Sequence, residues 1–182
     1  MGREFFEVPY KSKLQIRQYT KYVRHKLKIK GEYVDVVRLV EVQFPHFIPN
    51  YRFRVVNDED IDVNMRGVSA CTEVKDGKIT MYVLERVYDE ALEDRGRARF
   101  TLAHEGGHVL MHCTGDITLN RIECPDKLRI PIENERNPEW QADQFAAELL
   151  APFDMIQGMT KNEIMWKFKV SNTCALNRIS TK

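Results

Sequence analysis

The chain has 182 residues, of which 43% are hydrophobic and 30% are charged, and its formal net charge is +1. This size and composition are those of an ordinary globular protein, and we expect residues 1–182 to form a single domain. No apolar run approaches the roughly 20 residues that span a bilayer, and the first residues lack the apolar core of a signal peptide, so a membrane-spanning protein is excluded. We therefore expect a cytoplasmic location. The cysteines form no Cys-x-x-Cys pair and are expected to be free thiols, namely Cys71, Cys113, Cys124 and Cys174.

Positive charge is concentrated near the start of the chain. Residues 1–54 carry a formal charge of +7 and the remainder −6, and the segment from Lys11 to Lys30 holds eight basic residues and no acidic one. Apolar residues recur in this segment at helical spacing, namely Ile16, Tyr19, Val23 and Leu27. We interpret it as a helix with one face on the core and a solvated basic face. Transient contact with DNA or with an acidic partner is the alternative.

The first half of the chain is predicted to contain two helices followed by strands. The first helix covers residues 14–29 and ends at Gly31, the second covers residues 32–42, and residues 44–50, with two prolines, form a loop. A strand near residues 53–56 precedes a hairpin of residues 68–74 and 79–84 around Asp76-Gly77.

The second half is predicted to be mainly helical. Residues 112–137 contain Pro125 and Pro131 and are expected to be mostly irregular and to border a cleft. Short helices are expected over residues 161–168 and 172–179. Their joint, Lys169-Val170-Ser171, resembles a helix-turn-helix corner, so residues 160–182 are either a closure of the core, which we favour, or a DNA-binding appendage.

The segment His104-Glu105-Gly106-Gly107-His108 carries the most specific chemical signal. On an α-helix, positions i and i+4 lie on one face about 6 Å apart along the axis, so two imidazoles can converge on one ion. Glu105 projects beside them, where a carboxylate can take the proton of a water that attacks a carbonyl. The paired glycines cost roughly 1 kcal/mol each in a helix, which is tolerable if another backbone packs closely there.

A zinc site needs a third protein ligand, for which the chain offers several alternatives. The metzincin pattern requires Gly and His where the chain has Met111 and Thr114, so that class is excluded. His112 lies about 12 Å along the helix from His104, too far for three rings to share an ion on a straight helix. Cys113 follows the motif closely but is expected to point elsewhere.

The favoured third ligand is Glu139, in the first turn of a helix that Asn137 caps, that Pro138 begins and that ends before Pro152. By position alone, Glu139 is explained as an acidic residue at a helix N-terminus, but the upstream motif favours ligation. Asp143, one turn later, could accept the free ring N–H of a ligating histidine. The competing carboxylate, Glu148, is expected to point to solvent.

Two stretches carry a resemblance to a known family: Arg99-Phe100-Thr101-Leu102-Ala103-His104-Glu105-x-Gly107-His108-Val109-Leu110-x-His112 and Glu139-x-x-Ala142-x-x-Phe145-Ala146-x-x-Leu149-Leu150-x-Pro152. In this order they resemble the ImmA/IrrE family of metallo-endopeptidases, over roughly residues 80–179. The resemblance implies a gluzincin-type site with zinc on His104, His108 and Glu139 and with Glu105 as general base. It also implies cleavage of a helix-turn-helix repressor in phage, mobile-element or stress-response control. Gly106 departs from the family, which usually has a larger apolar residue there.

We predict an α+β fold in which a small antiparallel strand unit packs on several helices, one of them a zincin-like active-site helix. The predicted function is that of a zinc-dependent endopeptidase, with Zn²⁺ as cofactor and a repressor as substrate. Candidates for the group that stabilises the oxyanion are His112, Tyr82 and Tyr88. By analogy with other zinc proteases, the strand of residues 79–84 would hold the substrate. The rival functions are a zinc hydrolase of small amides and a non-catalytic regulator that binds a repressor or DNA.

Overall fold

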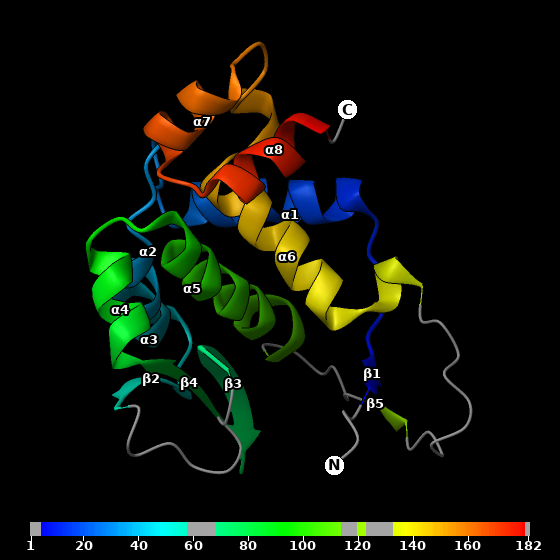
Figure 1. The fold of residues 1–182 in the computed structure, drawn as a ribbon. Helices are drawn as coiled ribbons and strands as arrows, with labels where there is room; N and C mark the ends of the chain where they lie inside the picture. Colours follow the sequence, from blue (N-terminus) through cyan, green and yellow to red (C-terminus); the bar gives the residue numbers. More distant parts are fainter. Residues whose placement is uncertain (1–4, 58–67, 114–119, 123–132, 181–182) are drawn as a thin grey trace.

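Helices on one side and a small sheet on the other make up the protein, whose computed structural model describes residues 5–57, 68–113, 120–122 and 133–180 (Figure 1). The α-helices are α1 (Lys13–Lys26), α2 (Val36–Arg38), α3 (Phe44–Phe47), α4 (Glu85–Leu92), α5 (Gly96–His108), α6 (Pro138–Leu150), α7 (Lys161–Phe168) and α8 (Asn172–Ser180). The strands are β1 (Phe5–Glu7), β2 (Tyr51–Val56), β3 (Ala70–Lys75), β4 (Lys78–Leu84) and β5 (Asn120–Ile122). Two π-helical segments, η1 (Leu39–Gln43) and η3 (Val109–Cys113), and two 3-10 turns, η4 (Asn134–Arg136) and η5 (Phe153–Met155), complete the described elements.

The main sheet has three strands in the order β2-β4-β3. The predicted hairpin is confirmed: β3 and β4 pair antiparallel across Asp76 and Gly77, whose positive φ angles of 50° and 70° suit a tight turn. β2 pairs with β4 in parallel. The α+β class is therefore confirmed, but the expected antiparallel unit is a mixed sheet, because β2 joins the second strand of the hairpin on the side away from β3. A separate antiparallel pair joins β1 to β5. Strand β5 lies within residues 112–137, which were expected to be mostly irregular. The same region also contains η4, and its residues 114–119 and 123–132 lie outside the described residues.

Helix α1 confirms the first predicted helix and its interpretation as a helix packed on the core. Ser12 and Gln15 form a capping box at its start. Ile16 and Val23 are buried, and the guanidinium of Arg24 is also buried, where it donates to the carbonyl oxygens of Leu149 and Gly31. The helix ends at Lys26, earlier than expected, because Lys28 adopts the left-handed conformation (φ 55°) that was expected of Gly31.

The second predicted helix begins later and continues further than its apolar pattern indicated. Asp35 caps it by accepting from the N–H of Arg38, and helical structure runs through α2, η1 and α3 to Phe47. Residues 44–47 of the expected loop are therefore helical, with Pro45 in the first turn of α3, directly after the wider π-helical turn of η1.

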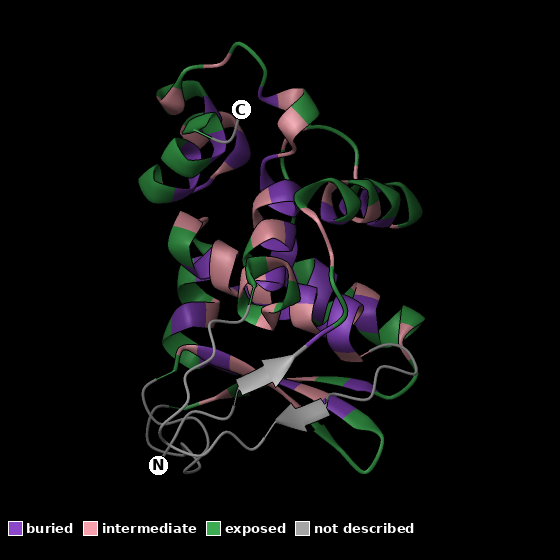
Figure 2. Ribbon diagram, turned by 90° about the vertical axis from the view of Figure 1, so that its right-hand side faces the viewer, coloured by how far each residue is buried: buried purple, intermediate pink, exposed green. Residues whose placement is uncertain are grey.

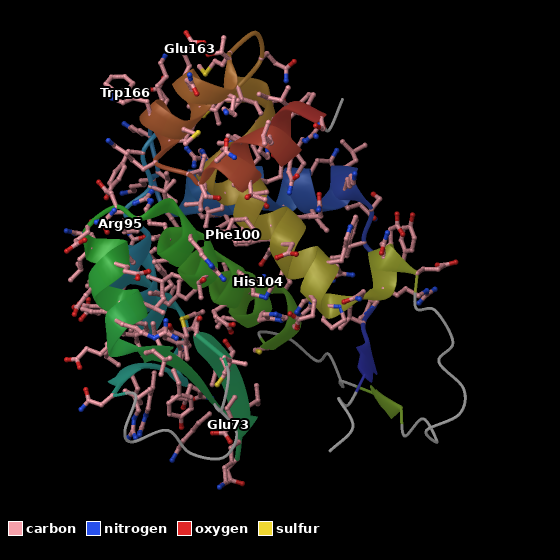
Figure 3. All side chains as sticks on the ribbon, viewed as in Figure 1. Glu73, Arg95, Phe100, His104, Glu163 and Trp166 are labelled. Atoms are coloured by element: carbon pink, nitrogen blue, oxygen red, sulfur yellow. The ribbon has the colours of Figure 1, made fainter. Side chains whose placement is uncertain are left out.

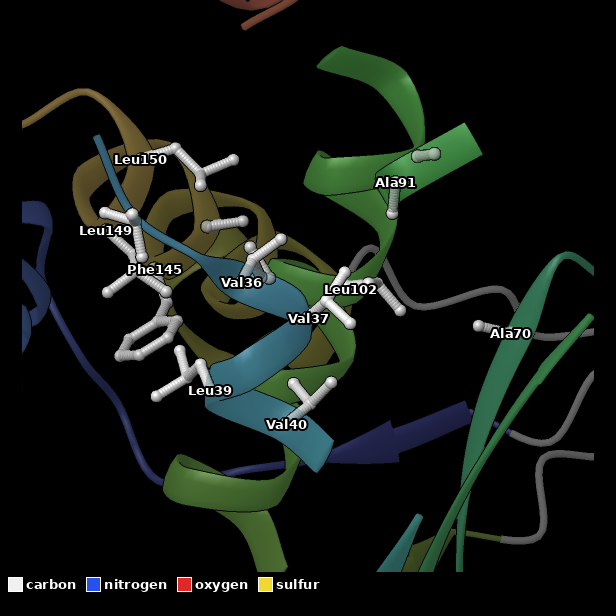
Figure 4. Close-up of a cluster of buried hydrophobic side chains, with 14 of the residues drawn as sticks. Val36, Val37, Leu39, Val40, Ala70, Ala91, Leu102, Phe145, Leu149 and Leu150 are labelled. Atoms are coloured by element: carbon white, nitrogen blue, oxygen red, sulfur yellow. The ribbon is translucent and has the colours of Figure 1, made fainter. Parts of the chain in front are cut away.

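Helices α5 and α6 lie side by side at the centre of the molecule, and their close approach explains one glycine of the motif (Figure 1). A Cβ on Gly107 would lie 3.1 Å from Cδ1 of Phe145 and 3.2 Å from Cα of Ala142. A Cβ on Gly106 would lie 3.5 Å from the ring of Phe44, an ordinary contact. The close backbone packing that makes a glycine tolerable in this helix is therefore present at Gly107. Valines and leucines of α2 and η1 pack against Leu102 of α5 and against α6 to form the core (Figure 4).

The C-terminal helices α7 and α8 are confirmed, with Lys169 in the left-handed conformation between them. Ile164, Phe168 and Ala175 are fully buried, and buried residues line the inner sides of the helices throughout the molecule (Figure 2). This packing supports closure of the core as the role of α7 and α8.

The expectation of free cysteines is met among the described residues. Cys71, Cys113 and Cys174 are free thiols, and Cys124 lies outside those residues. None of the helices in the described ranges combines the length and the apolar character that crossing a membrane requires.

Candidate metal centre

Three side chains from α5 and α6 converge on one point. His104 and His108 lie one turn apart on α5, with 3.0 Å between their Nε2 atoms. The carboxylate of Glu139 faces both: Oε2 lies 3.3 Å from Nε2 of His104, and Oε1 lies 3.3 Å from Nε2 of His108. His104 appears in Figure 3 where α5 faces α6. The three residues form a group that could hold a metal ion.

The start of α6 is what places Glu139. The side chain of Asn137 accepts hydrogen bonds from the backbone N–H groups of Glu139 and Trp140, and Pro138 occupies the first turn, as predicted. Because α6 crosses close to α5 at Gly107, its first turn reaches the two histidines. Glu139 remains 70% exposed, so the cluster faces solvent among the described residues.

The spacing of the three donors fits zinc. Zinc binds histidine nitrogens at about 2.0–2.1 Å in tetrahedral geometry, which separates neighbouring ligand atoms by about 3.3 Å. The observed separations of 3.0 and 3.3 Å match this edge length, and two imidazoles with one carboxylate are ligands that zinc accepts in open sites.

In the absence of a metal, the charges of the cluster favour a proton on His104. Burial disfavours the charged imidazole, but hydrogen bonds with Asp143 and Glu139 and the negative charge of Glu105 outweigh burial and raise the pKa of His104 to about 10. The hydrogen bond from His104 is the largest of the influences that lower the pKa of Glu139. The contact expected of Asp143 is present, since its Oδ1 lies 2.8 Å from Nδ1 of His104.

The expected general base, Glu105, is buried beside this cluster and is held by the sheet. The hydroxyl of Thr72 on β3 donates to Oε2 of Glu105 at 2.7 Å. Burial raises the pKa values of the Cys71 and Cys113 thiols to about 11, and the negative charge of Glu105 adds to both shifts and also favours the charged form of His104. Cys113 itself is outside the metal-binding group.

His112 lies behind His108 and not on the open side of the cluster. Its Nδ1 is 3.1 Å from Nδ1 of His108, and its Nε2 is 3.1 Å from Oε1 of Gln141. Burial lowers its pKa to about 4, so the ring is neutral at pH 7. Both ring nitrogens are thus engaged, and His112 is neither a metal ligand nor a free donor for an oxyanion.

The structure does not bring the two tyrosine candidates for the oxyanion to the cluster. The hydroxyl of Tyr82 donates to Glu73 at 3.4 Å, on the face of the sheet opposite Thr72, because side chains alternate along a strand. In Figure 3, Glu73 lies at the sheet, well away from His104. The hydroxyl of Tyr88 donates to Glu41 of η1 at 3.0 Å.

Glu148 does not point to solvent, contrary to the sequence-based expectation. It is 5% exposed, and its carboxylate pairs with Arg17 at 3.0 Å and with Arg178 at 2.9 Å while it accepts from the N–H of Phe153. Two arginines from distant parts of the chain neutralise it, which no local pattern reveals. Glu148 therefore links α6 to α1 and α8 through these ion pairs.

Sequence reasoning missed Thr72 and Gln141, which contact Glu105 and His112. Threonine is ordinary in a strand and glutamine in a helix, so neither carried a signal of its own. Spacing gave no signal either, because residues two apart on a helix lie on different faces, as Gln141 and Glu139 do on α6.

A helical His-Glu-x-x-His motif with a carboxylate from a following helix is the arrangement of metallopeptidases. The family model of the IrrE N-terminal-like domain, peptidase family M78, matches residues 75–180. The chain therefore belongs to the ImmA/IrrE family, which implies a metallopeptidase-type function. A comparison with curated proteins gave no significant match.

Proposed function

We propose that the protein is a cytoplasmic zinc-dependent endopeptidase. The observation that carries the proposal is the convergence of His104, His108 and Glu139 at the edge lengths of a tetrahedral zinc site, beside the buried carboxylate of Glu105. Zinc would supply a lowered pKa for a bound water and polarisation of the scissile carbonyl.

Glu105 supplies the proton transfers. Its carboxylate takes a proton from the attacking water and later delivers it to the leaving amine. The hydroxyl of Thr72 donates to one carboxylate oxygen of Glu105, which fixes the orientation of the group and leaves its other oxygen for this exchange. His104 and His108 present Nε2 to the metal, and Asp143 holds the ring of His104 through Nδ1.

The strand that best fits an extended substrate is β3 and not the segment of residues 79–84. That segment is β4, the central strand, whose two edges are both paired, so the prediction for it is wrong. Among the described residues β3 pairs with β4 alone, and Thr72 sets it beside Glu105. Its free edge can accept a peptide through main-chain hydrogen bonds. This edge and the exposure of Glu139 favour cleavage of a polypeptide over hydrolysis of a small amide.

The general-base role separates an enzyme from a non-catalytic regulator. Glu105→Gln keeps the shape but removes the proton acceptor, so zinc content should remain near wild type while turnover falls by a factor of about 100 or more. The measurements are metal content by atomic spectroscopy and cleavage of a verified substrate. Undiminished cleavage by Glu105→Gln would disprove the assignment.

The proposed substrate is a helix-turn-helix repressor, on the strength of family membership. The same Glu105→Gln variant should retain the substrate, so it can be co-purified and identified by mass spectrometry. A parallel preparation of His104→Ala/Glu105→Gln controls for capture that is independent of the metal. Proteins found only with the single variant are then tested as substrates of the wild type. If that set contains no protein of the repressor class, the proposal is contradicted.

We also propose that the basic segment Lys11–Lys30 steers the enzyme toward an acidic partner surface or toward DNA that carries the repressor. Arg24 is buried and donates to backbone carbonyl oxygens, and the charge of Lys21 is offset by Asp154, so neither is used for the test. Three of the exposed lysines of the segment, Lys13, Lys26 and Lys28, are chosen for the test. Reversing these three to Glu should slow repressor cleavage at low salt, without change in zinc content, and the defect should shrink as ionic strength rises. A wild-type rate at low salt with DNA present would leave α1 as a solvated surface.

A further inference from the structure

The two histidines of the cluster differ in what supports their rings. Nδ1 of His104 faces the carboxylate of Asp143, which can only accept a hydrogen bond. Nδ1 of His108 faces another imidazole nitrogen, Nδ1 of His112, at 3.1 Å. Between two neutral rings one nitrogen donates and the other accepts. The donor of this pair decides whether Nε2 of His108 carries a proton or a free electron pair for a metal.

The direction of this hydrogen bond is set at Gln141. The amide Nε2 of Gln141 donates to the backbone carbonyl oxygens of Pro9 at 2.9 Å and Glu135 at 2.6 Å. Carbonyl oxygens cannot donate, so the amide cannot turn over without losing both bonds. Its Oε1 must therefore face His112, whose Nε2 lies 3.1 Å away and carries the proton.

The remaining protons follow from that assignment. His112 is 4% exposed, and its ring nitrogens contact the ring of His108 and the amide of Gln141 and, among the described residues, no carboxylate. A second, charged proton would be buried there without a counter-charge, so the ring holds one proton, on Nε2, and its Nδ1 accepts from His108. His108 then carries its proton on Nδ1 and presents a free electron pair at Nε2, toward Glu139. We propose that Gln141 and His112 are positioning residues that hold His108 in its metal-binding tautomer. The inference rests on the proposed metal site.

The support reaches a part of the chain outside the family match. Pro9 precedes α1, and its segment is joined to the segment before α6 by hydrogen bonds from Val8 N–H to Arg136 O (3.0 Å) and from Lys11 N–H to Glu135 O (2.9 Å). Both acceptors of the Gln141 amide are thereby fixed to one another. The N-terminal segment thus contributes to the metal centre without touching the metal.

Two substitutions of His112 separate proton direction from packing. His112→Phe keeps a ring but removes the acceptor, and zinc affinity should fall by about 10- to 100-fold. His112→Asn is smaller but places an acceptor oxygen near the position of Nδ1, so it should recover most of the affinity. A purely structural role predicts the reverse order. Zinc affinity is measured by competition with a chelator, and wild-type affinity in His112→Phe, or weaker binding by His112→Asn, would overturn the inference.

The amide is tested in the same way on α6. Gln141→Leu keeps the approximate size but removes the bonds to His112, Pro9 and Glu135, and it should weaken zinc binding about tenfold or more. Gln144→Leu, the same change at a half-buried position three residues later, is the matched control and should bind zinc like the wild type. Equal affinities of the two variants would count against the role of Gln141.

A spectroscopic readout does not depend on zinc or on any variant. Long-range ¹H–¹⁵N correlation spectra of the zinc-free wild type should show His108 with its proton on Nδ1 and a bare Nε2, and His112 with its proton on Nε2. The opposite tautomers would overturn the inference. If the wild type shows the expected tautomers but binds no zinc, the proposed function is refuted instead. Failure of the inference and failure of the proposed function are therefore distinguishable.

Discussion

Adding one methyl group at each of two adjacent glycines should have opposite effects. In a helix interior, Gly→Ala stabilises by roughly 1 kcal/mol through the backbone alone. At Gly106 the new methyl would meet the ring of Phe44 at 3.5 Å, so the gain should be realised and the midpoint of thermal unfolding should rise by about 2–4 °C.

At Gly107 the same methyl meets backbone. It would lie 3.2 Å from Cα and 3.4 Å from O of Ala142, and 3.1 Å from Phe145. Because a backbone cannot turn aside as a flexible side chain can, α6 has to shift, and overpacking of this kind costs about 1–3 kcal/mol. After the gain in helix propensity is subtracted, Gly107→Ala should be less stable than the wild type by about 1 kcal/mol.

The shift also moves Glu139 relative to the two histidines, so Gly107→Ala should weaken zinc binding about tenfold while Gly106→Ala leaves it unchanged. Stability is measured by urea unfolding of the zinc-free proteins, because bound metal would add its own stabilisation. Zinc affinity is measured separately by chelator competition. If the two variants have the same stability and the same zinc affinity, the close approach of α5 and α6 does not position the site.

Three further outcomes are expected. Thr72→Val removes the hydrogen bond to Glu105, so turnover should fall about tenfold with unchanged zinc content; a wild-type rate would show that the hydroxyl is not needed. Because the pKa of His104 is about 10, the ring is protonated at pH 8 and zinc must displace that proton. Calorimetry in buffers of different ionisation enthalpy should thus detect about one proton released per zinc, and apparent affinity should rise about tenfold per pH unit below 10; no release would contradict this. Glu139→Gln should lose zinc and remain folded, whereas Glu148→Gln should keep zinc and lose about 3 kcal/mol or more in urea unfolding, because it leaves the buried Arg178 and the half-buried Arg17 uncompensated. The reverse pattern would exchange their roles.

Local sequence signals were sufficient wherever structure depends on near neighbours. The turn at Asp76-Gly77 and the cap at Asn137 act within a few residues, and the hairpin and α6 were predicted from them. The metal cluster was predictable because two ligands share one helical turn and the third follows a recognisable helix start.

Features that depend on distant contacts were not predictable. The parallel pairing of β2 with β4 requires knowing which edge of the hairpin is covered. The burial of Glu148 requires Arg17 and Arg178, which lie 131 and 30 positions away in the chain. The π-helical segment η3 follows His108, and its Leu110 carbonyl oxygen accepts from the hydroxyl of Tyr19 on α1, a partner outside the range of helical periodicity.

Helix α6 combines packing and chemistry in its first two turns. Glu139 faces both imidazole Nε2 atoms, while Asp143 and Gln141 fix the proton positions of the two rings, the latter through His112. Ala142 lies between them at the closest approach to α5. Since the same contact sets helix packing and donor spacing, the folded chain already holds its donors 3.0–3.3 Å apart, with the electron pairs of His108 and Glu139 directed inward. Zinc binding then requires the loss of a proton from His104 and little rearrangement of the helices, so a site of this kind is formed by folding and completed by the metal.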